Sequence, residues 1–183
     1  MIVKNYIGGK WIAGNQLQTI PVINPANGEE LATIPLSTKS EVEEAVAAAV
    51  KVAPLRALVN CAGYGGAIRI VDRDGNPGEL EKFESIIRVN IIGSYNALRF
   101  AAAAMAKNEL IDGERGACVL TASVAAYEGQ IGQIAYSAGK AGIVGMTLVA
   151  ARDLATKNIR VNTIAPGLFD TPLLARLPQE VRD

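Results

Sequence analysis

Histidine is missing from this sequence of 183 residues, and its absence excludes several kinds of active site. Without an imidazole there is no Ser-His-Asp triad, no Cys-His pair and no His-ligated metal centre. Cysteine is scarce too, because only Cys61 and Cys118 occur, each in an apolar stretch typical of a strand. Their spacing fits neither a metal site nor a disulfide framework, which predicts two reduced thiols in the core.

An excess of either charge is also missing, since 18 basic and 18 acidic residues cancel. The composition therefore gives no indication of a nucleic acid or an anionic membrane as partner. The N-terminus does not have the pattern of a signal or transit peptide, and the longest apolar runs are shorter than a membrane span. With 50% hydrophobic residues the chain can bury a core, so we expect a globular protein in the cytoplasm.

Apolar runs and turns predict two parts of different character along the chain. Residues 1–36 alternate short strand-like runs with Gly-Gly and Asn-Gly turns, which favours β-hairpins. From residue 37 onward helices and strands alternate, which predicts an α/β fold with a parallel sheet. The expected strands are 4–7, 10–13, 19–23, 30–35, 55–59, 117–121 and 159–164. The expected helices are 37–52, 79–107 (one long helix or two short ones) and 136–156.

These elements predict two domains, a β segment over residues 1–37 and a Rossmann-like domain over residues 38–183. Strand 30–35, helix 38–52 and strand 55–59 would form a right-handed βαβ unit. We expect strand 30–35 to pair beside strand 55–59, because an unpaired edge of a buried sheet is costly.

Tyr136 and Lys140 are four residues apart in the last expected helix, so they would lie on one face of it. A phenol with a pKa near 10 handles protons poorly at neutral pH, and a neighbouring ammonium favours its phenolate. Ser123, at the end of an expected strand, can donate a hydrogen bond to a substrate oxygen. Together the three residues suit proton transfer beside a cofactor that carries a hydride.

Tyr6 and Lys10 share this spacing and show that the spacing alone is a weak signal. Gly8 and Gly9 lie between them and oppose a helix, and no Ser precedes them at a suitable distance. We therefore expect an exposed hairpin pair at this place and no catalytic site.

Five motifs follow one another along residues 46–183. They are Leu58-Val-Asn-Cys-Ala-Gly63, Arg88-Val-Asn90, Thr121-Ala-Ser123, Tyr136-Ser-Ala-Gly-Lys140 and Ile159-Arg-Val-Asn-Thr-Ile-Ala-Pro-Gly167. In their residues and their order these motifs resemble those of the short-chain dehydrogenases. The segments 121–130 and 165–174 are most similar to the type II 3-hydroxyacyl-CoA dehydrogenases.

The resemblance implies a partial Rossmann-like, doubly wound parallel sheet and hydride transfer between NAD and a secondary alcohol or ketone, such as a 3-hydroxyacyl-CoA. Tyr136 would be the acid and base, Lys140 would favour its ionised form, and Ser123 would orient the substrate oxygen. Asn90 would anchor a water that relays protons through Lys140. Implied cofactor-binding residues are Asn60, Ala62, Gly63, Thr121, Tyr136, Lys140, Pro166, Gly167 and Thr171. Helices 80–107 and 136–156 would join copies in a homo-oligomer.

The Gly-rich turn Thr-Gly-x-x-x-Gly-x-Gly of that family has no counterpart in this sequence. Gly8, Gly9 and Gly14 have other spacings and fall in hairpins, where they would not hold a pyrophosphate. Residues 1–52 instead contain Tyr6-Ile-Gly-Gly-Lys-Trp11, Val22-Ile-Asn-Pro-Ala-Asn-Gly-Glu29 and Thr38-Lys-Ser-Glu-Val-Glu-Glu-Ala-Val-Ala-Ala-Ala49. These segments resemble the opening of an aldehyde dehydrogenase of the methylmalonate-semialdehyde type.

The two resemblances together imply a chimera, with a truncated short-chain dehydrogenase joined to the aldehyde dehydrogenase segment within residues 42–52. Two alternatives to the dehydrogenase stay open. One is a chain that folds without turnover, because half of the cofactor site is not recognisable. The other is aldehyde oxidation through a cysteine thioester.

Overall fold

The computed structural model describes residues 2–14, 18–23 and 29–169, which fall in two compact units. The N-terminal unit comprises Met1–Ala53 with Leu168–Asp183, and the sheet unit comprises Pro54–Gly167. The turn expected at 24–28 and the expected cofactor residue Thr171 lie outside the described residues. The domain boundary expected between residues 37 and 38 stays a prediction.

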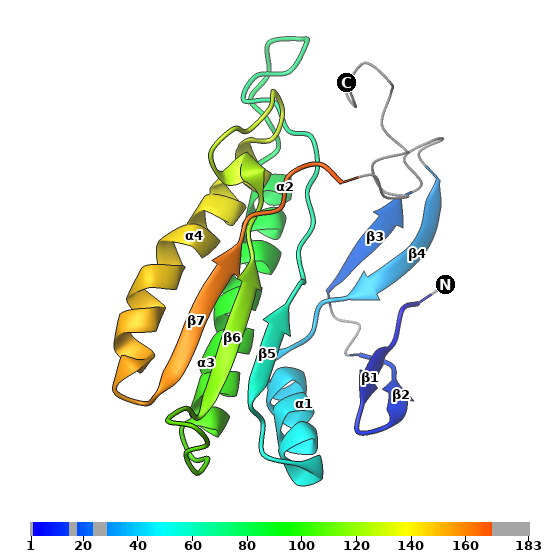
Figure 1. The fold of residues 1–183 in the computed structure, drawn as a ribbon. Helices are drawn as coiled ribbons and strands as arrows, with labels where there is room; N and C mark the ends of the chain where they lie inside the picture. The colour runs from blue at the N-terminus through cyan, green and yellow to red at the C-terminus, as the bar shows by residue number, and fades with distance from the viewer. Residues whose placement is uncertain (1, 15–17, 24–28, 170–183) are drawn as a thin grey trace. The chain divides into compact units, whose positions relative to one another are not determined.

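Antiparallel hairpins form the strands of the N-terminal unit (Figure 1). The pairs are β1 (Asn5–Ile7) with β2 (Lys10–Ile12) and β3 (Thr19–Ile23) with β4 (Glu30–Pro35). Gly8 and Gly9 turn the first hairpin with φ values of +57° and +82°, a left-handed conformation that glycine adopts without strain. Ile7 pairs with Lys10 across that turn, so the expectation of a hairpin at Tyr6 and Lys10 is confirmed.

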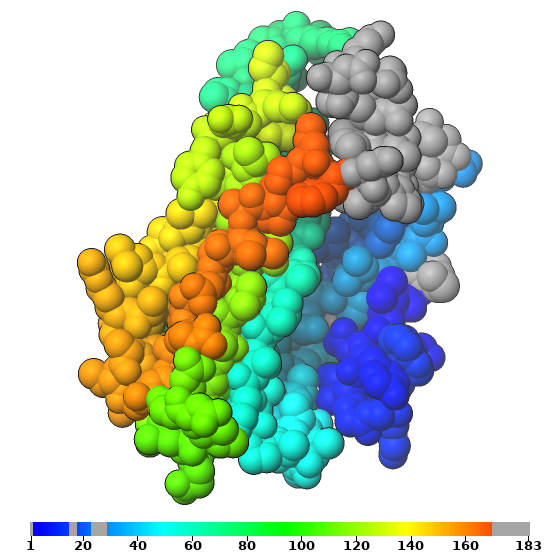
Figure 2. All heavy atoms as spheres, viewed as in Figure 1, coloured from blue at the N-terminus to red at the C-terminus, as the bar shows by residue number. Residues whose placement is uncertain are grey.

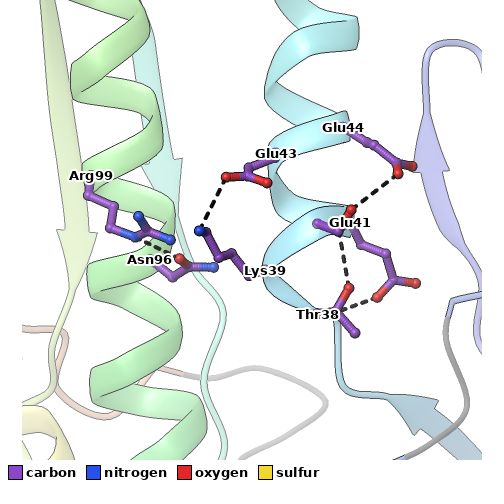
Figure 3. Close-up of polar contacts among 8 residues, drawn as sticks. Thr38, Lys39, Glu41, Glu43, Glu44, Asn96 and Arg99 are labelled. Carbon is purple, nitrogen blue, oxygen red and sulfur yellow. Dashed lines mark hydrogen bonds and ion pairs between the residues drawn. The ribbon is translucent and has the colours of Figure 1, made fainter.

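Helix α1 (Lys39–Val52) begins at a capping box. The Glu41 N–H donates to Thr38 Oγ1 at 3.2 Å, and the Thr38 N–H donates to Glu41 Oε2 at 2.6 Å (Figure 3). Because Thr38 occupies the cap, the helix starts two residues later than the sequence predicts. No residue of α1 is fully buried, so the cap is a larger part of its stability than it would be in a core helix.

The sheet unit holds a parallel sheet in the order β5-β6-β7, with helices packed on one face (Figure 1). The strands are β5 (Ala57–Asn60), β6 (Gly116–Thr121) and β7 (Ile159–Ile164). The main helices are α2 (Leu80–Ile87), α3 (Ser94–Met105) and α4 (Ile134–Ala155). Strand residues Cys118 and Leu120 pack in one core with Leu98, Met105 and Ile143 of the helices. The expected α/β fold with N-terminal hairpins is thus confirmed.

Within the described part of the sheet unit no helix covers the opposite face, and the atoms of β5, β6 and β7 are visible there in Figure 2. Val59 is 66% exposed there and Ile164 is 51% exposed. Among the described strands β5 pairs with β6 alone and β4 pairs with β3. The expectation that strand 30–35 pairs beside strand 55–59 is therefore wrong. A local hairpin with β3 closes a shorter loop than a crossover would, and a shorter loop costs less chain entropy.

Residues 80–105 run through α2, a π-helix η1 (Arg88–Gly93) and α3 without interruption. Such π turns are rare and occur often at functional sites. The sequence predicts one long helix or two short ones here. Apolar spacing does not report a local change in the hydrogen-bond pattern, so the π turn was not predictable from it.

Helix α4 is 22 residues long and is apolar enough, by length and composition, to cross a membrane. The uninterrupted apolar runs of the sequence predict no membrane span. They miss α4, because Lys140 and Arg152 interrupt its apolar runs while the helix as a whole stays apolar on average. In the structure α4 contacts β6, β7 and α2, and its buried residues are Ala135, Gly139, Lys140 and Ile143. Core helices of folded proteins share this composition.

Candidate active site

The carboxyl ends of the three parallel strands meet at one edge of the sheet, where open α/β sheets bind ligands. The register pairs Asn60 with Leu120 and Thr121 with Ile164, so the loops after all three strands begin at this edge. The Val124 N–H donates to the Pro166 carbonyl at 2.9 Å, which joins two of those loops.

Lys140 is the centre of the polar cluster at this edge. Lys140 is only 4% exposed, and its Nζ donates a hydrogen bond to the Thr121 carbonyl at 2.7 Å. Burial lowers the pKa of the Lys140 ammonium, and the nearby Cys61 thiol partly opposes that shift. Tyr136 precedes Lys140 by one turn of α4, with the ammonium 5.6 Å from the centre of its ring. The sequence prediction that both lie on one helix face agrees with this geometry.

Ser123 lies two residues after the strand residue that holds Lys140. It caps the short 3₁₀ helix η2 (Val124–Ala126), and its Oγ accepts the Ala125 N–H at 3.2 Å. A hydroxyl that accepts from the backbone keeps its own hydrogen for a ligand. Beside this loop lies a hollow of about 610 Å³, whose walls come mainly from residues 68–71 and 125–134.

Asn90 is fully buried in the π-helix. Its Nδ2 donates to the carbonyls of Tyr64 at 2.7 Å and Ile86 at 2.9 Å. Its Oδ1 has no hydrogen-bond partner among the described residues. A buried amide oxygen without a partner indicates a place where a water or a ligand atom completes the site.

Glycines bring the loop after β5 close to these side chains. A Cβ added at Gly63 would lie 2.6 Å from Asn90 Oδ1 and 3.0 Å from Lys140 Nζ. A Cβ added at Gly65 would lie 2.9 Å from the Tyr136 ring. The loop can approach the polar cluster only because both positions lack a side chain.

Of the remaining expected cofactor residues, most are accessible at this edge and one is buried. Ala62, Gly63 and Gly167 are exposed, and Pro166 is half-buried. The Asn60 side chain instead points inward, is 8% exposed and donates to Ser94 Oγ at 2.8 Å. Sequence reasoning missed Ser94; a polar residue one turn after a buried Asn is the signal that could have indicated it.

A family model described as short chain dehydrogenase matches residues 24–182. The chain belongs to the short-chain dehydrogenase family. The 3-hydroxyacyl-CoA dehydrogenase type-2 of Drosophila melanogaster is 48% identical over 160 residues, which are 85% of this chain and 63% of that protein. The Homo sapiens protein of the same name is 48% identical over 149 residues, 80% of this chain and 57% of its own. The match begins at residue 24, upstream of residue 46, where the resemblance in the sequence analysis starts.

A solved structure of this family resembles the fold. The crystal structure of 3-hydroxyacyl-CoA dehydrogenase type-2 from Mycobacterium avium has a TM-score of 0.73 and 46% identity, over 82% of this chain and 60% of that one. The chain therefore spans about three fifths of the length of these short-chain dehydrogenases.

Membership of the short-chain dehydrogenases implies a nicotinamide dinucleotide, NAD or NADP. The described residues show which parts of that cofactor the site fits. Lys140 has two N–H groups beyond the one that Thr121 accepts, and Gly63 leaves space beside it. This polar end fits a ribose with its hydroxyls. In the described residues no turn has the glycine spacing that holds a pyrophosphate, because Gly8 and Gly9 form a hairpin turn. The described site thus fits one end of the cofactor.

Proposed function

We propose that this chain is an oxidoreductase that handles the proton in NAD-dependent interconversion of a 3-hydroxyacyl thioester and its ketone. The observation that supports this proposal most directly is a hydrogen bond between α4 and β6. The 2.7 Å hydrogen bond from Lys140 to Thr121 holds the Tyr136 face of α4 at the strand end that leads to Ser123.

Each side chain then has one task in the oxidation of the alcohol. Ser123 donates a hydrogen bond to the substrate oxygen and orients it. Tyr136 is the base that takes the hydroxyl proton, and the Lys140 ammonium lies one helical turn away, 5.6 Å from the centre of its ring. NAD, when bound, would supply the acceptor for the hydride. Lys140 and Gly63 would hold the nicotinamide ribose, and the free Oδ1 of Asn90 supports a water that passes the proton onward.

The acyl part of the substrate fits the 610 Å³ hollow beside the Ser123 loop. Its lining is mostly apolar, and the lining side chains with polar groups are those of Arg69, Tyr127, Gln130 and Ser137. An acyl thioester has the same character, with a long apolar chain and few polar atoms.

Binding and turnover test this proposal in two steps. NADH should bind with micromolar affinity, and a short 3-hydroxyacyl-CoA should reduce NAD at a rate that Tyr136→Phe abolishes. Tyr6→Phe is the matched control, because Tyr6 has the same spacing to a lysine but is 62% exposed in a hairpin. An absence of binding at millimolar NADH would refute the proposal and favour a chain that folds without turnover.

The likeness of residues 1–52 to an aldehyde dehydrogenase, and with it the chimera, stays a prediction. The short-chain dehydrogenase match starts at residue 24 and so overlaps the second half of that segment. Aldehyde oxidation needs a cysteine thiolate. Cys118 is fully buried and its pKa is raised to about 11 by that burial, which disfavours this role for it.

Self-association through α3 and α4 is the partner proposal that accompanies the enzyme. A hollow of about 340 Å³ lies between these helices and is lined by residues that include Tyr95, Arg99 and Ala103. Tyr95 is 55% exposed and Leu148 is 58% exposed. Sedimentation should show a dimer or a larger assembly that Leu148→Glu weakens, and a monomer at all concentrations would refute this proposal.

A further inference from the structure

Polar side chains are rare in the core, and the buried ones of the described residues gather in one region. They are Asn60, Asn90, Ser94 and Lys140. Ser94 is 1% exposed and joins two of the others. It accepts a hydrogen bond from Asn60 Nδ2 at 2.8 Å and donates its own hydrogen to the Asn90 carbonyl at 2.6 Å.

The Ser94 hydroxyl donates to a backbone carbonyl at the end of the π-helix. In an α-helix the Ser94 N–H would bond the Asn90 carbonyl four residues earlier. Here that N–H donates to Ile91, and the Ser94 side chain reaches Asn90 instead. A hydrogen bond to a buried carbonyl stabilises the conformation that makes it, so the hydroxyl stabilises this particular course of the backbone.

The course of the backbone at Asn90 determines where its side chain lies. The Asn90 amide holds the Tyr64 carbonyl, and the next residue, Gly65, packs against the Tyr136 ring. The amide oxygen lies beside Gly63, within reach of the same space as Lys140 Nζ. A shift of Asn90 would therefore move groups next to both Tyr136 and Lys140.

We propose that Ser94 is a positioning residue of the site, which acts by holding the Asn90 carbonyl. The hydroxyl aligns the Asn90 side chain with Lys140 and with the loop over Tyr136. Its effect on catalysis rests on the proposed dehydrogenase function, whereas its effect on Asn90 does not.

Hydrogen exchange of the Asn90 side-chain amide tests the role without any activity. The resonance is identified in ¹⁵N spectra by its loss in Asn90→Ala. In Ser94→Ala the amide should exchange about tenfold faster, since one buried hydrogen bond is lost. Ser94→Thr keeps the hydroxyl and should restore the protection. Ser94→Cys has a similar size and a weak donor, so it should fold and show intermediate exchange.

Thr147→Val is the matched control, because Thr147 Oγ1 makes the same kind of bond to the carbonyl four residues earlier, at 2.8 Å, and a second one to Thr163. It should leave Asn90 exchange unchanged. Equal loss of protection in Thr147→Val, or full protection in both Ser94→Ala and Ser94→Cys, would overturn the proposal.

A kinetic readout separates this proposal from the proposed function. If the wild type turns over, Ser94→Ala should lower kcat several-fold with little change in the KM for NAD, and Ser94→Thr should recover it. Unchanged kcat with faster amide exchange would overturn the link to catalysis. If the wild type neither binds NADH nor turns over, the proposed function fails while the exchange data still decide the role of Ser94.

Discussion

Replacing Gly63 with alanine should displace the site and destabilise the sheet unit. The new Cβ would lie 2.6 Å from Asn90 Oδ1, about 0.8 Å closer than the shortest ordinary contact of 3.4 Å. It would also lie 3.0 Å from Lys140 Nζ. Both residues are buried, so neither side chain can move without disturbing its own hydrogen bonds. Overpacking of this kind costs about 1–3 kcal/mol, and each kcal/mol lowers Tm by about 2–4 °C in a chain of this length.

Two other glycines of the sheet unit provide matched controls. At Gly116 a Cβ would lie 2.6 Å from Met105 Sδ and 2.9 Å from the Arg56 carbonyl, at the opposite end of β6. Gly116→Ala should therefore lower stability without moving Asn90 or Lys140. At Gly145, inside α4, a Cβ would meet nothing within 4 Å. Gly145→Ala should stabilise the helix by about 0.5–1 kcal/mol.

Denaturant unfolding of the three variants measures the stability, and ¹⁵N spectra of the Asn90 amide report on the site. The reasoning predicts a shifted Asn90 resonance in Gly63→Ala alone. Wild-type stability of Gly63→Ala, or an equal shift of Asn90 in Gly116→Ala, would refute it.

Three further predictions concern the cap, the thiols and Lys140. Thr38→Ala removes the capping box of α1 and should destabilise that helix by about 1 kcal/mol, seen as faster exchange of its amides, whereas Ser40→Ala should not. The prediction of two core thiols is wrong for Cys61, which is exposed, whereas Cys118 is buried. Thiol reagents should modify Cys61 quickly and Cys118, with its pKa raised to about 11, only after denaturation; two fast thiols would contradict the structure. Burial lowers the pKa of Lys140 in the folded chain below the 10.5 of an exposed lysine. Between the folded and the unfolded pKa the unfolded chain binds more protons, so the free energy of unfolding rises with pH in that range. Unfolding at stepped pH should show the wild type gaining stability over Lys140→Met toward pH 10.5, and a constant difference would exclude this effect.

The order of helices and strands was predictable because apolar spacing reports burial. Strands β3, β4 and β7 have the expected bounds, and the glycine pair made the first hairpin recognisable. The four-residue spacing of Tyr136 and Lys140 was enough to place them on one helix face, since an α-helix repeats at that interval.

The partner strand of β4 and the buried hydrogen bonds beneath the site were not predictable in the same way. The partner of β4 depended on the competition between a hairpin and a crossover, which local pattern does not report. The inward turn of Asn60 and its bond to Ser94 depend on the packing of α3 against β5. A sequence motif names Asn60 but does not tell whether its amide faces a ligand or the core.

The π-helix at Arg88–Gly93 also limits which changes in length the protein can accept. Each residue of an α-helix rotates its successors by about 100°, so one residue more or less turns everything downstream by that angle. The buried positions Ile86, Asn90, Ser94 and Leu98 follow one another at every fourth residue through this segment. Deleting one residue here would rotate Leu98 and Met105 away from β6. Insertions and deletions should therefore be far more harmful in this turn than most substitutions in it.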